Sequence, residues 1–397
     1  MKIFKILSFS IVFFAILVSA KAQKITEQVK NNNNFTFDLF NDVDNNDNVF
    51  LSPFSVSTAL AMTYEGAENK TRNEMSKVLY FPQNNEKVNK NFSEIIKKTQ
   101  ITNNKKHYTF NIANSLWAQQ DFEFLHSYFE TIKRYYAAPI QMVDYKDDAN
   151  RAKVRLGINK WVESKTNNKI KDLISEKDLD NETKLVLVNA VYFLSEWKKA
   201  FKKEATKDGD FFSFTGKTKK EFMHTSAKMK YFGDEKFKVL EIPYKNNKAS
   251  MIILMPNEIQ AFYEFKKGLN ADFFNSVKNK LRYESISLYL PKFKIEFKQD
   301  LAKTLSNAGM KRAFSSKADF GAMVCKKNIR IDKIIHQTFI DVDEVGTEAA
   351  AATAVVMKRV TSVKPSKKIE FKADKPFVFL IRENTTGSIL FIGQLVK

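Results

Sequence analysis

An alanine run close to the C-terminal end gives this chain a segment with two opposed conformational preferences. Ala349–Ala352 would favour a helix, because alanine has the highest helix propensity. The β-branched residues Thr353, Val355 and Val356 come directly after this run and favour a pleated strand. The stretch 344–356 has no proline and no large side chain, so it can be an exposed loop in one state and an inner strand in another. The alternative is the end of an alanine-rich surface helix.

The length and the apolar content of the chain favour a large folded core. The chain has 397 residues, of which 44% are hydrophobic and 36 are phenylalanine. Disordered chains lack such apolar content. No linker long enough to divide the chain follows residue 22, so we expect one domain over residues 23–397.

The first 22 residues have the pattern of a secretory signal peptide. Lys2 and Lys5 form a short basic region, residues 6–18 are an apolar run interrupted by serines, and Ala20-Lys21-Ala22 fits a small-x-small cleavage site. The apolar run is short for a membrane anchor. No later segment reaches about 18 uninterrupted apolar residues. The sequence therefore predicts a secreted, extracellular protein without a membrane span, cleaved after Ala22 or alternatively after Ala20.

The single cysteine and the candidate glycosylation sites are relevant to the prediction of secretion. Cys325 is the only cysteine, so no disulfide within the chain can form. We expect Cys325 to be a buried small hydrophobic residue rather than a reactive thiol. Five Asn-x-Ser/Thr sequons are candidates for glycosylation, and we expect some of them to be used. They begin at Asn34, Asn69, Asn91, Asn181 and Asn384.

The strong positive charge constrains the partners. The formal net charge is +20, and such a charge attracts polyanions. The basic residues are scattered among acidic ones, and no zinc-finger, RNP-like or basic-zipper pattern occurs, so nucleic acid is not an expected partner. A solvated lysine-rich surface is the simplest interpretation. A sulfated glycosaminoglycan is the polyanion that remains a candidate partner.

The sequence does not have the motifs of common enzyme classes. None of the four histidines lies in a His-Glu-x-x-His motif. A Gly-x-Ser-x-Gly nucleophile turn and a phosphate-binding Gly-Lys loop are also missing. We therefore expect neither an enzyme nor a bound cofactor or metal.

Helical patterns dominate the first part of the chain. Apolar residues at Phe35, Leu39, Phe40 and Val43 follow helical spacing. Ser52-Pro53 then predicts a helix start, with Ser52 as the N-cap and Pro53 at the first helical position, and Gly66 marks its end.

Strand patterns dominate the rest. The run 185–194 is almost wholly apolar, which is typical of a strand buried on both faces. Residues 286–290 and 293–297 alternate, and the phase changes at Pro291-Lys292, which predicts a strand break there. Residues 251–255 form another buried strand, and residues 377–381 and 389–396 form a terminal hairpin. Helices early and strands late indicate an α+β fold.

Several motifs occur together in one order. Residues 48–57 read NVFLSPFSVS, residues 187–193 read LVNAVYF and precede Trp197, and residues 290–293 read LPKF. Residues 376–382 read PFVFLIR, and residues 387–393 read GSILFIG. With the segment 344–356, these motifs cover nearly the whole chain after residue 22. In this respect the chain resembles the serpins, serine-protease inhibitors that trap their targets by loop insertion. One departure is that the family often ends in proline after this run, whereas this chain stops at Lys397.

The resemblance implies a fold and a set of site residues. It implies three β-sheets, about nine helices, and a reactive loop at about residues 344–365. The largest sheet opens to accept the cleaved loop, and its gate would consist of Ser52, Ser55, Asn189 and His336. Trp197, Lys292 and Glu344 would lie at the end of the sheet where insertion starts, with Lys292 and Glu344 as an ion pair. The hinge of the loop would consist of Glu344, Gly346, Thr347, Glu348, Ala349, Ala350, Ala351, Ala352 and Thr353.

The resemblance also implies a mechanism. An extracellular serine protease would cleave the loop as a substrate and stay attached as a covalent acyl-enzyme. The loop would then enter the sheet as a strand. About 14 residues at roughly 3.3 Å each would carry the protease about 45 Å. The protein would act as a metastable monomer.

The cleaved bond has two candidates. By the family's register, Val360 lies sixteen residues after Glu344, which gives the bond Val360-Thr361 and suits an elastase-like pocket. By chemistry, Arg359 suits a trypsin-like pocket, whose carboxylate forms charge-assisted hydrogen bonds with arginine. The alternative function is that of a non-inhibitory serpin, which acts as a carrier, chaperone or storage protein. The small residues of the hinge favour an inhibitor.

Overall fold

The computed structural model describes residues 27–43, 46–100, 108–325, 329–347 and 368–397. Its elements form an α+β arrangement in which most helices precede most strands, as the sequence indicates. A first helix covers the described residues 27–42, with Phe35, Leu39 and Phe40 buried on its inner face. The other α-helices are α2 (Pro53–Gly66), α3 (Asn69–Leu79), α4 (Asn85–Gln100), α5 (His126–Tyr136), α6 (Asp148–Lys165), α7 (Phe262–Lys267), α8 (Ala271–Lys280) and α9 (Ala302–Asn307).

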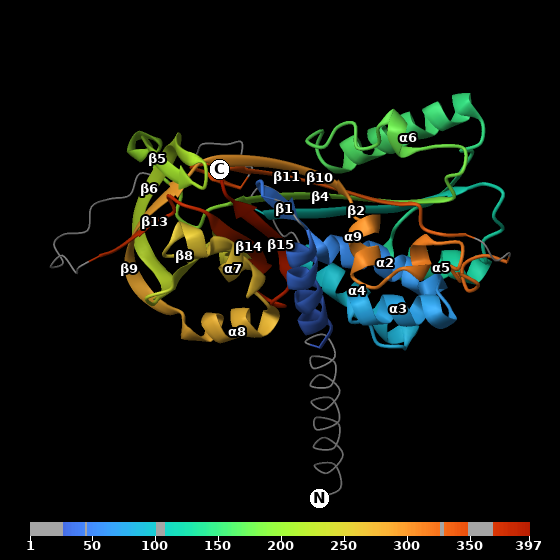
Figure 1. Ribbon diagram of the computed structural model, residues 1–397, viewed down its shortest axis with the longest axis horizontal. Helices are drawn as coiled ribbons and strands as arrows, with labels where there is room; N and C mark the ends of the chain where they lie inside the picture. Colours follow the sequence, from blue (N-terminus) through green and yellow to red (C-terminus); the bar gives the residue numbers. More distant parts are fainter. Residues whose placement is uncertain (1–26, 44–45, 101–107, 326–328, 348–367) are drawn as a thin grey trace, which may run out of the picture.

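A six-stranded sheet runs along the long axis of the molecule (Figure 1). One of its inner strands, β4 (Leu185–Glu196), corresponds to the apolar run predicted at residues 185–194. It is buried because α6 packs on one face of the sheet and α2 on the other. The strand order is β10 (Phe293–Asp300), β11 (Lys333–Val342), β12 (Gly346–Thr347), β4 (Leu185–Glu196), β2 (Tyr108–Gln119) and β3 (Ile140–Val143).

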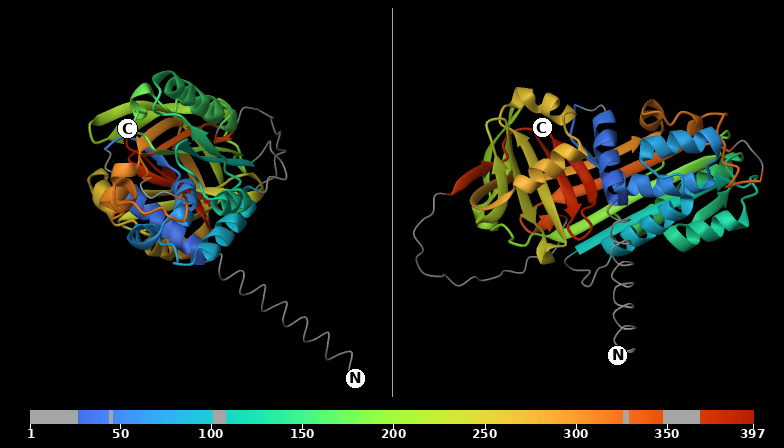
Figure 2. Two further views of the ribbon diagram at one scale, coloured as in Figure 1. Left: turned by 90° about the vertical axis from the view of Figure 1, so that its right-hand side faces the viewer. Right: turned by 90° about the horizontal axis from the view of Figure 1, so that it is seen from below.

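A nine-stranded sheet curves around the other end of the molecule (Figure 2). Its order is β1 (Val49–Leu51), β15 (Ile389–Leu395), β14 (Phe377–Glu383), β8 (Ala249–Pro256), β7 (Phe237–Pro243), β6 (Gly216–Gly233), β9 (Arg282–Pro291) and β13 (Ile369–Lys372), and β5 (Lys207–Ser213) pairs with β6.

The described strands thus form two continuous sheets where three were expected. The cause is β6, which is 18 residues long. One end of β6 pairs with β5, the other end pairs with β7, and the stretch between pairs with β9. Two groups of strands therefore share β6 and are joined into one hydrogen-bonded sheet.

The main core lies between the two sheets. The ring of Phe391 on β15 lies 4.8 Å from that of Phe50 on β1, 5.7 Å from Phe110 on β2 and 5.8 Å from Phe193 on β4. These rings are buried, and aromatic contacts of this kind contribute beyond the apolar area that they bury. The cluster joins the nine-stranded sheet to the centre of the six-stranded one.

The helix α2 starts where the sequence predicts, but Ser52 does not cap it with a side-chain hydrogen bond. Pro53 begins the helix and Gly66 ends it. Ser52 occupies the N-cap position, yet its side chain makes no capping hydrogen bond. Its hydroxyl donates to the carbonyl oxygen of Leu390 on β15 at 2.8 Å instead. Ser52 therefore fastens α2 to the nine-stranded sheet.

The predicted strand break and the predicted terminal hairpin are confirmed, whereas the prediction for the cysteine is not. The strand break lies at Lys292, between β9 and β10, and β14 and β15 form the terminal hairpin. Gly387 in that turn has φ 84°, a conformation that glycine adopts readily. The prediction for Cys325 is wrong, since it is exposed. It directly follows Val324, which is buried and forms an isolated bridge with Phe124, and the chain turns outward after that residue.

The signal-peptide prediction lies outside the described residues. Among the helices that the structure describes, none has the length and apolar character needed to cross a membrane.

Candidate functional site

The centre of the six-stranded sheet has an unusual pairing pattern. Over part of their length β4 and β11 pair directly and in parallel, from Lys333↔Val186 to Thr338↔Val191. At the other end the two-residue strand β12 lies between them and is antiparallel to both, with Thr347 opposite Val342 on β11 and opposite Ser195 on β4. The chain that follows Thr347 therefore begins at the seam between β4 and β11.

The predicted gate residues meet across this seam. Asn189 on β4 donates through Nδ2 to Ser55 Oγ of α2 at 2.5 Å, and its Oδ1 lies 2.5 Å from Nδ1 of His336 on β11. The backbone N–H of Ser52 donates to His336 Nε2 at 3.1 Å. All four residues are fully buried. The network links β4, β11 and the start of α2.

These contacts fix the state of His336. Because Nε2 accepts a hydrogen bond, Nδ1 must carry the proton that it donates to Asn189, so the imidazole is neutral. Burial lowers the pKa of His336 to about 3, from an ordinary value of 6.5. A protonated His336 would have to donate from Nε2 as well, and it would lose the bond from Ser52.

The end of the sheet at β12 is built around Trp197. Its backbone N–H donates to the carbonyl oxygen of Val345, and its Nε1 donates to that of Asp343, both at 2.9 Å. Its ring stacks on Tyr244, with centroids 4.5 Å apart and planes at 6°. The Tyr244 hydroxyl lies 2.6 Å from Thr347 Oγ1. Trp197 and Tyr244 thus hold the first residues of the predicted hinge.

Gly346 allows this close approach. A Cβ on Gly346 would lie 2.1 Å from the carbonyl oxygen of Ser195 and 2.7 Å from Cα of Glu196. Both atoms belong to the backbone of β4 and cannot move aside cheaply. A glycine is therefore required for β12 to enter the seam.

Lys292 and Glu344 form an ion pair of 3.6 Å beside this end. The Glu344 carboxylate also accepts from Thr206 Oγ1 at 2.8 Å, and Lys292 contacts Glu221 at 3.3 Å. Burial alone would raise the pKa of Glu344, but the Thr206 hydrogen bond and the Lys292 charge outweigh it and lower the pKa. Burial alone would lower the pKa of Lys292, but Glu344 and Glu221 outweigh it and raise the pKa.

The rest of the predicted loop lies outside the described residues. This applies to the hinge residues from Glu348 to Thr353 and to the candidate bond residues Arg359, Val360 and Thr361. Of the hinge, Glu344, Gly346 and Thr347 are described, and they begin at the seam.

The five sequons have different settings. Asn181 is exposed, and Asn69 is exposed while its Nδ2 donates to Asp319. Asn384 is half-buried and its Nδ2 donates to Ser250 Oγ at 2.9 Å. Asn34 is half-buried within the first helix, and Asn91 is buried within α4. Asn69 and Asn181 are therefore the accessible positions among the five.

Several residues of the site have no signal in the sequence. Asn114 on β2 is buried opposite Asn189, accepts from Asn189 Nδ2, and donates through Nδ2 to the Ser55 carbonyl oxygen at 3.3 Å. Tyr244 and Thr206 were also not singled out. Only the strand register and the tertiary contacts reveal them. The described residues hold no cluster of three His, Cys, Asp or Glu side chains that could bind a metal.

Comparison with known proteins shows which family has this sequence and fold. The family model "Serpin (serine protease inhibitor)" matches residues 30–397. Human Serpin B4 is 37% identical over 386 residues, covering 91% of this chain and 97% of its own. Leukocyte elastase inhibitor from Xenopus laevis is 37% identical over 376 residues, covering 91% and 96%. The native-state crystal structure of tengpin, a thermophilic serpin, superimposes with a TM-score of 0.84 at 31% identity and covers 93% of this chain and 94% of its own.

The matches extend over nearly the full length of each partner, and they include the strands and the seam described above. Membership of this family also places the chain among protease inhibitors rather than enzymes. The chain belongs to the serpin family.

Proposed function

We propose that this protein is a secreted inhibitor of serine proteases that is cleaved in its reactive loop and traps the protease as an acyl-enzyme by inserting that loop between β4 and β11. The observation that carries the proposal is β12. Gly346 and Thr347 already lie in the seam as an antiparallel strand, so the following residues can continue it without any change of direction.

The strand arrangement gives insertion a driving force. Continuing β12 would replace one parallel pair, β4 with β11, by two antiparallel pairs, which are somewhat more stable per residue. The gain is larger than this difference, because a new row of main-chain hydrogen bonds forms and one face of the loop becomes buried.

The dimensions of the sheet fit the loop. The strand β4 has 12 residues, and at roughly 3.3 Å each it spans about 40 Å. The small side chains from Ala349 to Ala352 would be the first to follow β12. They can enter between packed strands with little steric cost, which favours an inhibitor over a carrier, chaperone or storage protein.

The protease and the cleaved bond are part of the proposal. Arg359 would direct the inhibitor to trypsin-like proteases and Val360 to elastase-like ones. The relative from Xenopus laevis bears the name leukocyte elastase inhibitor, which supports the elastase-like choice at the level of the family. Secretion rests on the signal-like residues 1–22, and a sulfated glycosaminoglycan is the polyanion that the net charge of +20 favours.

The test is to incubate the protein with trypsin-like and elastase-like proteases and to separate the products on a denaturing gel. We expect an adduct that survives boiling in detergent, together with a released C-terminal peptide. Cleavage without an adduct for every trypsin-, elastase- and chymotrypsin-like protease would overturn the proposal. A tagged chain expressed in a eukaryotic host should appear in the medium and begin after residue 22.

A further inference from the structure

The strand β3 forms one edge of the six-stranded sheet. In the described part of the chain β3 pairs only with β2, so no strand lies on its other side. Leu116 on β2 donates its N–H to the carbonyl oxygen of Pro139, which fixes the direction of the main-chain groups along β3. Successive residues of a strand direct these groups to opposite sides. The N–H and C=O groups of Ile140 and Met142 therefore point away from β2, toward a position that a further strand can occupy.

The edge at β3 lacks the usual protection against pairing with another chain. Edge strands of soluble proteins carry charges, prolines or bulges that prevent such pairing. The strand at the opposite edge, β10, follows this rule, because Lys294, Glu296 and Lys298 are exposed on it. The strand β3 reads IQMV and contains neither a charge nor a proline. It also exposes an apolar side chain, since Met142 is 38% exposed.

The sequence of β3 is complementary to itself in the antiparallel direction. With Ile140 of one copy opposite Met142 of the second, each such pair exchanges two main-chain hydrogen bonds. These two side chains lie on one face and form an apolar cross-strand pair. A two-fold axis then passes at Gln141, whose exposed side-chain amide can both donate and accept. The two copies of Gln141 can therefore hydrogen-bond to each other.

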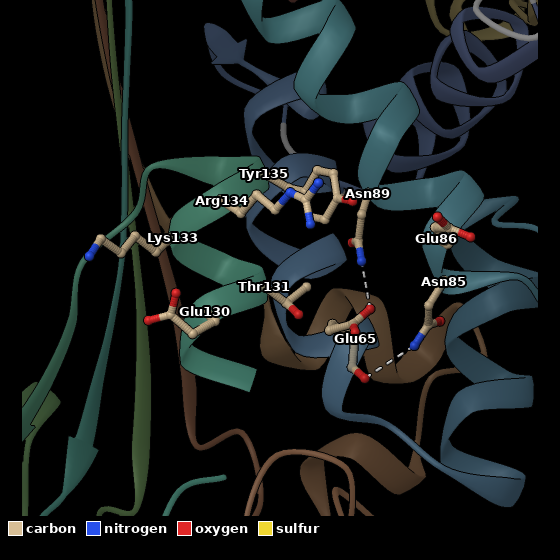
Figure 3. A pocket seen from close by; sticks show the side chains of 9 residues that line it. All are labelled: Glu65, Asn85, Glu86, Asn89, Glu130, Thr131, Lys133, Arg134 and Tyr135. Atoms are coloured by element: carbon tan, nitrogen blue, oxygen red, sulfur yellow. Dashed lines mark hydrogen bonds between the residues drawn. The ribbon is translucent and has the colours of Figure 1, made fainter. Parts of the chain in front are cut away.

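The surface around the start of β3 is positively charged. Lys133 and Arg134 lie in the last turn of α5, shortly before β3, and both are exposed (Figure 3). Arg134 also lines a surface hollow beside residues 112–114 of β2, together with Lys97 and Lys165. None of the described residues that line this hollow is a carboxylate. We call this region the basic end of the edge.

The surface around the end of β3 is negatively charged. Five carboxylates gather there, and two of them belong to the start of α6 or its N-cap. The five are those of Asp121, Asp144, Asp147, Asp148 and Glu182. Among the described residues, three cations pair with members of this group, namely Lys146, Arg151 and Lys184. The carboxylates outnumber these cations, and we call this region the acidic end of the edge.

The two ends make the antiparallel arrangement the favourable one. A two-fold axis at Gln141 places the basic end of one copy beside the acidic end of the other, and it does so twice. A parallel arrangement would bring like charges together. Complementary charge of this kind selects the partner and the orientation of an interface, and a self-complementary surface is what a two-fold dimer requires.

The edge lies away from the seam. In the sheet order, β4 and β2 separate β3 from the position of β12. Pairing at β3 therefore leaves the seam open and does not depend on the proposed function.

We propose that two copies of this chain pair through β3 in the antiparallel direction and form a reversible dimer with one sheet continuous across both copies. The partner is thus a second copy of this chain. Because interfaces of this small size are weak, the dissociation constant should be on the order of 100 µM. Dilute protein is then the monomer that the resemblance implies, and the dimer forms where the protein is concentrated.

The first experiment measures association of the intact protein by sedimentation velocity, at concentrations below and above this dissociation constant. We expect the mean mass to rise toward that of a dimer. Met142→Pro should stay monomeric with an unchanged melting temperature, because the N–H that it removes points away from β2. Met142→Lys should weaken association at least about tenfold, since a charge on an edge strand opposes pairing. The control Leu156→Lys adds the same charge at an apolar position of α6 that is 57% exposed and should associate as the unchanged protein does.

The second experiment tests the orientation by exchanging charges. Arg134→Glu and Asp148→Arg should each weaken association at least about fivefold, because each variant brings like charges together at both ends of its dimer. An equal mixture of the two variants should associate as strongly as the unchanged protein. In the mixed dimer both ends again join opposite charges.

Four results would overturn the proposal. Protein that stays monomeric far above the expected dissociation constant would exclude the dimer. Equal association of Met142→Pro, Met142→Lys and the unchanged protein would exclude β3 as the interface. Association that is lost in the loop variant Ala350→Pro and kept in Met142→Pro would mean that the copies are linked through the reactive loop. A mixture that associates no better than either charge variant alone would contradict the antiparallel arrangement.

Discussion

Gly346 is the residue at which the backbone geometry decides whether the hinge can enter the sheet. We expect Gly346→Ala to expel β12, because the new Cβ would lie 2.1 Å from the Ser195 carbonyl oxygen. The cost of such overpacking is typically about 1–3 kcal/mol. Hydrogen exchange of residues 343–347 should become faster, and the yield of covalent adduct should fall.

Gly157 provides the control for this substitution. It lies on α6, and a Cβ there would meet nothing within 4 Å. Gly157→Ala should leave exchange at residues 343–347 unchanged and add about 0.5–1 kcal/mol of helix stability. Unchanged exchange in Gly346→Ala would contradict the close approach at β12.

His336 makes the closed gate sensitive to pH. Its pKa in the folded protein is about 3, whereas an unfolded chain has the ordinary value of 6.5. Between these values the unfolded state binds a proton that the folded state does not bind, so the free energy of unfolding falls as the pH falls through this window. The stabilising contribution is complete above about pH 6.5.

The measurement is the urea midpoint of the intact protein between pH 7.5 and pH 4.5, compared with that of His336→Gln. One such group changes the free energy of unfolding by up to about 1.4 kcal/mol per pH unit. We expect the variant to depend less steeply on pH, since carboxylate titrations are common to both proteins. Parallel curves for the two proteins would show that His336 does not titrate in this window.

At the scale of elements, the position of the two-residue strand β12 between β4 and β11 gives the direction in which the residues after Thr347 would extend the sheet. Ala350 lies outside the described residues, but as a continuation of β12 it would be an inner strand residue with neighbours on both sides. Ala350→Pro removes an N–H and should convert the inhibitor into a substrate, with cleavage but little adduct. Ala350→Ser keeps the N–H and the small size, so it should retain the adduct. Full adduct yield from the proline variant would argue against insertion.

The cleaved bond is a second property of the loop. Arg359→Ala should abolish trypsin-like inhibition and leave elastase-like inhibition intact, because a trypsin-like pocket requires the guanidinium. Val360→Asp should reduce elastase-like inhibition more. Sequencing of the released peptide distinguishes the two sites: a start at Val360 means cleavage after Arg359, and a start at Thr361 means cleavage after Val360. A start elsewhere would refute both assignments.

Elements with strong patterns were predictable from the sequence. The apolar run of β4, the Pro53 start of α2 and the terminal hairpin all follow from local preferences and periodicity. The strand β6 was not predicted, because its first half is rich in lysine and largely exposed, so it has weak apolar alternation. That omission also explains why the continuous nine-stranded sheet was not foreseen.

The site was predictable only in part, for a related reason. Ser52, Ser55, Asn189 and His336 were assigned by resemblance to a family, whereas Asn114 has no local signal in an asparagine-rich chain. Its role depends on the register that places it opposite Asn189. Cys325 was wrongly placed because hydrophobic character alone does not show that the core contact ends one residue earlier, at the buried Val324.

At the scale of the whole molecule, the intact structure is incomplete at its centre. The seam holds two residues of an additional strand, and the polar network of the gate closes the rest. The aromatic core around Phe391 joins the two sheets in the intact molecule. Under the proposed function, β4 and β11 would separate to admit the loop as a further strand.

The melting temperature should consequently rise when the loop is cleaved. The cleaved chain can add the segment after Thr347 to the sheet, which forms hydrogen bonds on both sides and buries one face. For a chain of this length a net gain of ~4 kcal/mol would raise the midpoint by roughly 5 °C, and calorimetry before and after limited proteolysis measures it. Cleaved Ala350→Pro is the matched control, because its loop is cut but cannot complete the strand. Equal melting temperatures of the cleaved and the intact protein would mean that the intact sheet is already at its most stable and that loop cleavage releases no stored free energy. An equal rise in the proline variant would mean that the gain does not come from completing the strand.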